Sequence, residues 1–258
     1  MFLAEPVPSI TEILFIVPQG DAGDANKNGK RSAAADEFVE LTNTSTKELD
    51  LKGWSLVDSD SWAFLTERGK IPWTKAVEKL KHDGKDWVFV FPTCKLRSGD
   101  RAVVFNGFEQ SPKGPCGSRE AAAERNKDFD RSFVFTMKVE TGKVALGNDG
   151  DWVALISPKG EYVEVVKWGK PDVPVPSDAK ATEAPADPKG STQRENAAGK
   201  FVDHASLGNK DRLMSPGEFT VTTSSPAPVR KPEATPKTDP ATPKDDKAPD
   251  TPAGDDKK

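Results

Sequence analysis

The sequence contains few of the residues that carry chemistry. Its 258 residues include two cysteines, two histidines and one tyrosine. A structural zinc site takes four ligands at characteristic spacings, and the sequence has neither a Cys-x-x-Cys pair nor paired histidines. His82 and His204 lie in charged or polar stretches, where a surface role is the usual one. Because a Gly-x-Ser-x-Gly elbow is also missing, the sequence predicts a protein that is not an enzyme.

Long apolar runs and an excess of positive charge are missing too. No run reaches the roughly 18 apolar residues of a transmembrane helix. The formal net charge of −4 gives no basic footprint for nucleic acid. Residues 1–7 predict an N-terminal arm that lacks the basic and apolar regions of a complete signal peptide. The end of a signal peptide that begins upstream is the alternative left open.

The two cysteines allow two interpretations. A disulfide between Cys94 and Cys116 would close a loop of about 20 residues and contribute about 3 kcal/mol in the chain-entropy model. The alternative is a pair of free thiols, one of them half-buried beside a strand.

The composition predicts one packed domain followed by an unpacked tail. Charged residues make up 30% of the chain and it contains 22 prolines, so apolar surface cannot be buried evenly along its length. Almost all Trp and Phe residues precede residue 220, which predicts a domain over residues 8–222. Residues 223–258 combine regularly spaced prolines with mixed charges and predict a disordered, extended tail.

Short alternating segments predict an all-β fold. In residues 37–41 acidic and apolar residues alternate, so we expect a half-solvated strand with Glu37 and Glu40 facing outward. About eight such strands separated by turn residues favour a β-sandwich. The other predicted strands are residues 10–17, 87–91, 101–105, 133–137, 144–146, 152–156, 162–168 and, as a closing or terminal strand, 219–222.

Two short helices are predicted within insertions. Thr74 is expected to cap residues 75–82, and Ser118 is expected to cap residues 119–125. Insertions are expected near residues 62–86, 108–131 and 170–190, and the Pro-rich stretch of the last predicts a long exposed loop.

Several segments together resemble one known family. Residues 36–43 read DEFVELTN and residues 49–56 read LDLKGWSL. The other matching segments are residues 20–29, 91–105, 146–155 and 167–169, with 191–194, 201–206 and 215–217 at the end. In these segments the chain resembles the lamin tail domain family, bacterial type, which is an immunoglobulin-like β-sandwich.

The resemblance implies a function class but no catalytic residues. It implies a non-catalytic module that binds or tethers a protein or a cell-surface polymer, on secreted or surface proteins of bacteria. Lamin tails are also linked with chromatin, so nucleic-acid binding is an alternative that the net charge disfavours. A further alternative is a calcium-dependent accessory domain of a hydrolase.

One polar loop suggests a calcium site. Asp24, Asn26 and Asn28 fall at positions one, three and five of a calcium-binding loop, where oxygen ligands are needed. The bidentate Glu of the twelfth position is missing, and Asp21 is the candidate to replace it. The alternative is an Asx-rich loop whose side chains cap their own backbone.

Three aromatic residues mark a candidate partner surface. Trp62, Phe64 and Trp73 lie among lysines in the first insertion. Aromatic rings among cations are typical of a surface that binds a protein or a glycan. The alternative is a cover over an edge of the sandwich, which exposed strands need.

Overall fold

The computed structural model describes residues 6–81, 83–208 and 212–218. The chain divides into two units, residues 1–223 and 224–258, and every described residue lies in the first. The predicted tail, the predicted strand at 219–222 and His82 therefore lie outside the described residues. Within the described ranges, no helix is long and apolar enough to cross a membrane.

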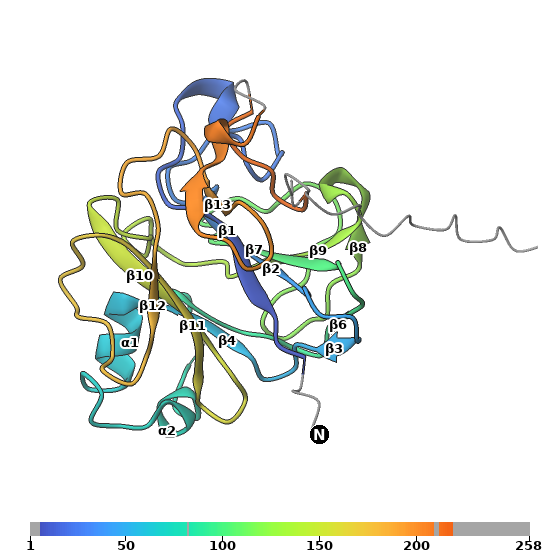
Figure 1. Ribbon diagram of the computed structural model, residues 1–258. Helices are drawn as coiled ribbons and strands as arrows, with labels where there is room; N and C mark the ends of the chain where they lie inside the picture. Colours follow the sequence, from blue (N-terminus) through green and yellow to red (C-terminus); the bar gives the residue numbers. More distant parts are fainter. Residues whose placement is uncertain (1–5, 82, 209–211, 219–258) are drawn as a thin grey trace, which may run out of the picture. The chain divides into compact units, whose positions relative to one another are not determined.

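Two sheets form the body of the described unit, and a small β3–β6 pair accompanies them (Figure 1). The large sheet contains, in spatial order, β14 (Phe201–Asp203), β13 (Thr192–Arg194), β1 (Ser9–Leu14), β2 (Phe38–Thr42), β7 (Arg101–Phe105), β9 (Ser132–Thr136) and β8 (Arg125–Asn126). The second sheet contains β12 (Ala181–Glu183), β11 (Tyr162–Gly169), β10 (Gly150–Ile156), β4 (Ser55–Asp58) and β5 (Val88–Val90). β3 is Leu49–Asp50 and β6 is Lys95–Leu96.

Most neighbouring strands are antiparallel, and two pairs are parallel. β9 runs parallel to β7, and β12 runs parallel to β11. The first strand, β1, lies between β2 and the late strand β13. The pairing of β1 with β2 is interrupted by a register shift between Ile10 and Glu12, which is a β-bulge.

The main core lies between the inner faces of the two sheets. Trp168 of β11 stacks on Phe15 with ring centroids 4.3 Å apart and an interplanar angle of 12°. Phe89 of β5 meets Phe135 of β9 at 5.3 Å. All four side chains are at most 1% exposed. The predicted all-β sandwich is confirmed.

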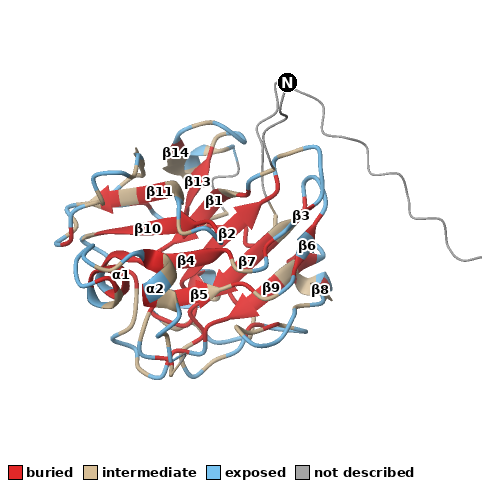
Figure 2. Cartoon of the chain, turned by 90° about the horizontal axis from the view of Figure 1, so that it is seen from below, coloured by how far each residue is buried: buried red, intermediate tan, exposed pale blue. Residues whose placement is uncertain are grey.

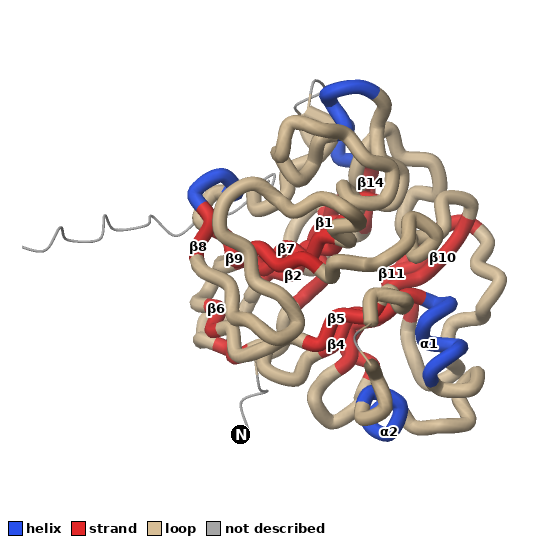
Figure 3. Tube along the Cα trace, turned by 180° about the vertical axis from the view of Figure 1, so that it is seen from behind, coloured by secondary structure: helices blue, strands red, loops and turns tan. Residues whose placement is uncertain are grey.

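The outer face of the second sheet is also covered. Helices α1 (Ser59–Leu65) and α2 (Trp73–Val77) lie against it, together with residues 173–181 (Figure 3). The prediction of a long exposed loop at 170–190 was wrong in part. Many of its residues are exposed, but Val173 is 3% exposed, and β12 adds a strand to the sheet.

The outer face of the large sheet is covered as well, and the strands are mostly buried on both sides (Figure 2). The cover comes from the loop that contains η1 (Gly20–Gly23), from η2 (Lys127–Phe129) and from residues 213–217, which follow η3 (His204–Ser206). Glu40, which accepts the N–H of Gly217, is consequently 0% exposed, whereas Glu37 bonds to Asn106 and Leu146 and is 2% exposed. The prediction that they face solvent was wrong, because the local pattern does not show which distant segments pack on each side chain.

The local predictions failed mainly at helices. Residues 119–121 form a bend in which Ser118 Oγ accepts the backbone N–H groups of Glu120 and Ala121, each at 3.2 Å; residues 122–124 are irregular, and Arg125 begins β8. The predicted strand at 144–146 is irregular. α2 starts one residue before Thr74, after Pro72, and ends at Val77 rather than continuing to residue 82.

Candidate functional site

A pocket of about 530 Å³ opens between α1, the segment after α2 and residues 143–145. We call it the insertion pocket, because most of its lining belongs to the first predicted insertion. Acidic and basic side chains line it in equal number: Asp58, Asp60, Asp83, Asp86, Lys79, Lys81, Lys85 and Lys143. Only Lys85 and Asp83 among these form an ion pair, at 3.3 Å, in the part of the chain that the structure describes.

Phe64 lies at the rim of this pocket. It is 76% exposed, whereas its neighbours Trp62 and Ala63 are buried. Residues two apart on an α-helix point in directions about 200° apart, so burial of Trp62 against the second sheet turns Phe64 toward solvent. The exposed ring therefore follows from the way α1 packs.

Asp58 forms the inner wall of the pocket. It ends β4 and caps α1, since its Oδ1 accepts the backbone N–H of Ser61 at 2.9 Å. The residue is only 4% exposed. Burial, together with the negative charge of Asp151, raises the pKa of Asp58 well above the usual range of an aspartate.

Two further carboxylates lie behind Asp58. Asp151 accepts the N–H of Trp152 at 2.7 Å and that of Gly147 at 2.9 Å. Glu37 accepts the N–H of Leu146 at 3.1 Å, and burial raises its pKa well above its usual range. Main-chain donors hold both groups, and neither lines the pocket.

The described lining presents mainly charged and aromatic groups. Ser61 is its one hydroxyl, and Ser61 Oγ already accepts the N–H of Trp87 at 2.8 Å. The described lining contains no histidine or cysteine that would activate a nucleophile. The pocket instead offers an exposed ring, ammonium donors and carboxylate acceptors.

Comparison with protein families places the whole pocket inside a known domain. The model described as Lamin Tail Domain matches residues 12–170, which is more than half of the chain. The chain belongs to the lamin tail domain family. The match includes all residues of the insertion pocket and ends before β12, β13 and β14.

Other comparisons add little about this lamin tail domain. No curated protein matches it. A crystal structure of a DUF4876 family protein from Bacteroides thetaiotaomicron is similar, with 15% sequence identity and a TM-score of 0.29. The similarity covers 59% of this chain and 42% of that chain, so less than half of the other protein's length is spanned. A likeness at this level supports no inference about a ligand.

The structure separates the three aromatic residues that the sequence grouped. Trp62 and Trp73 are 6% and 5% exposed and pack on the outer face of the second sheet. The indole N–H of Trp62 donates to Tyr162 Oη at 2.7 Å. Of the three, only Phe64 is on the surface, and the two tryptophans cover a sheet face rather than a sheet edge.

The oxygens of the predicted calcium loop face backbone N–H groups. Asp24 accepts the N–H of Asn28 at 3.1 Å and that of Gly29 at 2.8 Å. Asn26 Oδ1 also accepts the N–H of Asn28, and Asp21 lies exposed. Within the described ranges, no three His, Cys, Asp or Glu side chains are placed to hold a metal ion. These contacts favour the alternative of a loop that caps its own backbone.

We expect Asp24→Ala to lower the free energy of unfolding by about 1–2 kcal/mol, because the N–H of Gly29 loses its acceptor and that of Asn28 loses one of two. Asp21→Ala, which removes an exposed carboxylate, is the matched control and should change it by less than about 0.5 kcal/mol. Urea unfolding followed by circular dichroism measures both. The calcium hypothesis makes a different prediction: added calcium raises the unfolding midpoint of the intact chain, and either substitution abolishes the rise.

Both cysteines are free thiols in the structure. Cys94 lies in the main core, and burial raises its pKa to about 12. Cys116 is partly buried and packs on the cluster outside the large sheet. This arrangement corresponds to the free-thiol alternative that the sequence left open.

The sequence did not single out Asp58 as a site residue. A signal was present, because Asp58 directly precedes Ser-Asp-Ser, and Asp is a preferred residue at a helix N-cap. The neighbouring carboxylates Glu37 and Asp151 come from distant strands, so no local pattern joins them to Asp58.

Proposed function

We propose that this lamin tail domain is a non-catalytic binding module that holds a hydroxyl-rich cell-surface polymer, such as a neutral glycan, in the insertion pocket. The observation that carries the proposal is the exposed Phe64 ring beside a lining with balanced charges.

The chemistry of the lining supports a neutral, hydroxyl-rich ligand. An ammonium group only donates hydrogen bonds and a carboxylate only accepts them, whereas a hydroxyl does both. A sugar chain can therefore satisfy both kinds of side chain in the pocket. A cationic ligand meets four lysines there, and an anionic ligand meets four aspartates, of which Asp58 has a raised pKa.

Phe64 supplies the apolar part of such a site. The C–H face of a sugar ring is apolar and packs on an aromatic ring while its hydroxyls reach polar neighbours. Ligand sites commonly combine an aromatic wall with a few polar groups. A ring that is 76% exposed in a free domain gains burial when a ligand covers it.

We expect Phe64→Ala to weaken binding of the full chain to a neutral glycan roughly tenfold, or about 1.4 kcal/mol. A glycan array with neutral, anionic and cationic members identifies the ligand, and calorimetry then measures its affinity. Phe64→Tyr keeps the ring and is the matched control, which should bind like the unchanged chain.

The same experiment decides against the proposal in two ways. Binding to no glycan rejects the polymer ligand, and equal binding by Phe64→Ala rejects the pocket. Retention on DNA that weakens steeply with salt would favour the nucleic-acid alternative instead.

An extracytoplasmic location is part of the proposal, because a cell-surface polymer is met only there. The Pro-rich residues 223–258 would then serve as a spacer that tethers the domain. The genomic sequence upstream of Met1 tests the location, since a signal peptide encoded there supports it.

A further inference from the structure

Residues 212–218, which we call the closing segment, pack over the outer face of the large sheet. They follow the family match, which ends at residue 170. Met214 and Ser215 are 8% and 0% exposed. The surface beneath them is unusual, because two buried glutamates lie at its centre.

Glu12 and Glu40 are direct partners across β1 and β2. Such partners lie on one face of a sheet with Cβ atoms about 5 Å apart, and like charges there are destabilising. Both residues are 0% exposed. The pair therefore tolerates two negative charges poorly while the closing segment covers it.

The closing segment binds both glutamates. Glu12 accepts the N–H and the Oγ–H of Ser215, each at 2.7 Å, and the Oγ–H of Ser191 at 2.5 Å. Glu40 Oε2 accepts the N–H of Gly217 at 2.8 Å. Its Oε1 lies 2.8 Å from Thr11 Oγ1, so a protonated Glu40 has a hydroxyl to which it can donate.

Gly217 allows the close approach that this contact needs. Its φ of +83° lies in the left-handed region, and a Cβ there would be 2.5 Å from the carbonyl oxygen of Phe129. The carbonyl of Gly217 accepts hydrogen bonds from Arg101 Nη1 and Ser132 Oγ, each at 2.9 Å. Both main-chain groups of Gly217 are thus held by side chains of the sheet.

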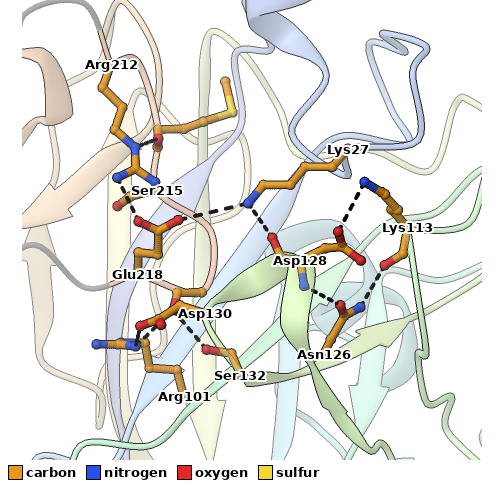
Figure 4. Close-up of polar contacts among 12 residues, drawn as sticks. Lys27, Arg101, Lys113, Asn126, Asp128, Asp130, Ser132, Arg212, Ser215 and Glu218 are labelled. Carbon is orange, nitrogen blue, oxygen red and sulfur yellow. Dashed lines mark hydrogen bonds and ion pairs between the residues drawn. The ribbon is translucent and has the colours of Figure 1, made fainter.

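Glu218 at the end of the closing segment forms one ion pair within the segment and one with a residue outside it (Figure 4). Glu218 lies between Arg212, at 2.8 Å, and Lys27, at 4.0 Å. These groups are about one third exposed. Ion pairs this exposed contribute little to stability. The buried contacts of Ser215 and Gly217 therefore contribute most of the free energy that docks the segment.

Polar groups beside the closing segment are incompletely satisfied. The buried atoms that lack a partner in the described chain include Gln193 Oε1, Arg101 Nε and His204 Nε2. Each of these side chains also bonds to the closing segment through another atom. Unpaired buried polar atoms cost free energy, so the docked state is less favourable than an apolar contact of the same size.

We propose that Glu12 and Glu40 form a proton-dependent latch, which holds residues 212–218 on the large sheet and releases them as the pH rises. When the two carboxyl groups hold one proton between them, a single negative charge lies under the closing segment. Loss of that proton places two facing charges on side chains that are 0% exposed.

The electrostatics of Glu40 support the direction of the switch. Burial, together with the negative charge of Glu12, raises the pKa of Glu40 to about 8 against the opposing charge of Arg101. A released Glu40 is solvated and has an ordinary pKa near 4.5. The docked state thus binds the proton more tightly than the released state. As the pH rises from the released pKa near 4.5 to the docked pKa of about 8, the equilibrium constant for docking falls by up to about tenfold per pH unit.

The other charged or titratable groups around the pair are few. Those from the elements that pack on it are Arg101, paired with Asp130, and Arg212, Glu218, Lys27 and His204. Arg101 and Arg212 favour an ionised pair, and Arg101 is 13% exposed and bonded to Asp130 and Gly217. Their charges reduce the effect without reversing its sign.

Hydrogen exchange of the full chain, corrected for the intrinsic rate at each pH, tests the latch. Between about pH 5 and pH 8, we expect the protection of the Ser215 and Gly217 amides to fall by at least tenfold in total, while β7 amides stay protected. Glu40→Gln keeps the shape and the acceptor without the charge, so its protection should not change with pH. Glu37→Gln, which removes a buried acid that does not bond to the closing segment, should retain the fall.

Two results would overturn the latch. One is flat protection of Ser215 and Gly217 in the unchanged chain, a measurement that depends on no variant. The other is a fall of the same size in Glu40→Gln. Should Glu40→Gln not fold, Glu12→Gln serves as the second variant. Its fall should be smaller and end at a lower pH, because loss of the facing charge lowers the pKa of the docked Glu40.

Discussion

Arg194→Ala is expected to lower the free energy of unfolding by about 3–5 kcal/mol, because it leaves Glu164 buried without its partner. Arg194 of β13 and Glu164 of β11 form an ion pair that joins the two sheets, with side chains 9% and 12% exposed. The same two side chains bond to the backbone of Ile10, whose N–H donates to Glu164 and whose carbonyl accepts from Arg194, each at 2.8 Å. Arg194 also lies over the ring of Phe201 at 4.5 Å.

The matched control is Lys167→Ala, which breaks an exposed ion pair of β11, the strand that contains Glu164. Lys167 and Glu183 are 2.9 Å apart, with side chains 32% and 70% exposed. Its loss should cost less than about 1 kcal/mol. Urea unfolding at neutral pH compares the two variants, and equal losses would contradict a structural role for the buried pair.

A second large loss of stability is expected for Trp168→Ala, about 3–5 kcal/mol. The Trp168 ring is 0% exposed and fills the space between the sheets against Phe15. Its indole N–H also donates to the carbonyl of Gly147 at 2.7 Å. The substitution therefore leaves both a cavity and an unpaired carbonyl.

Trp168→Phe should lower the free energy of unfolding by less than Trp168→Ala does, because it keeps an aromatic ring on Phe15. Phe64→Ala is the surface control, since that ring is 76% exposed and its removal should change stability by less than about 0.5 kcal/mol. Thermal unfolding followed by circular dichroism ranks the three variants. A loss in Phe64→Ala as large as that in Trp168→Ala would contradict the assignment of Phe64 to the binding surface.

The strands could be predicted because their pattern is local. β7 was predicted over residues 101–105 and occupies those residues. Its apolar run and the preceding turn residues lie next to one another in the sequence. The β-sandwich was predicted because several such segments occur along the chain.

The covers over the sheets could not be predicted, because they come from distant parts of the chain. Glu40 resembles an outward-facing residue within residues 37–41, yet Gly217 packs on it. In the candidate site, too, the exposure of a side chain depends on packing that the local sequence does not show. Phe64 was recognised as part of an aromatic insertion, but only the packing of α1 distinguishes it from the buried Trp62.

The position of β1 also has a consequence for biosynthesis. Its second neighbour, β13, is translated roughly 180 residues after it. Until residue 194 has left the ribosome, one edge of β1 in the nascent chain has no partner, and an open edge invites pairing with other chains. A shortened gene product that ends at residue 170 would contain the whole family match and keep this edge bare, so it should aggregate where the longer polypeptide does not.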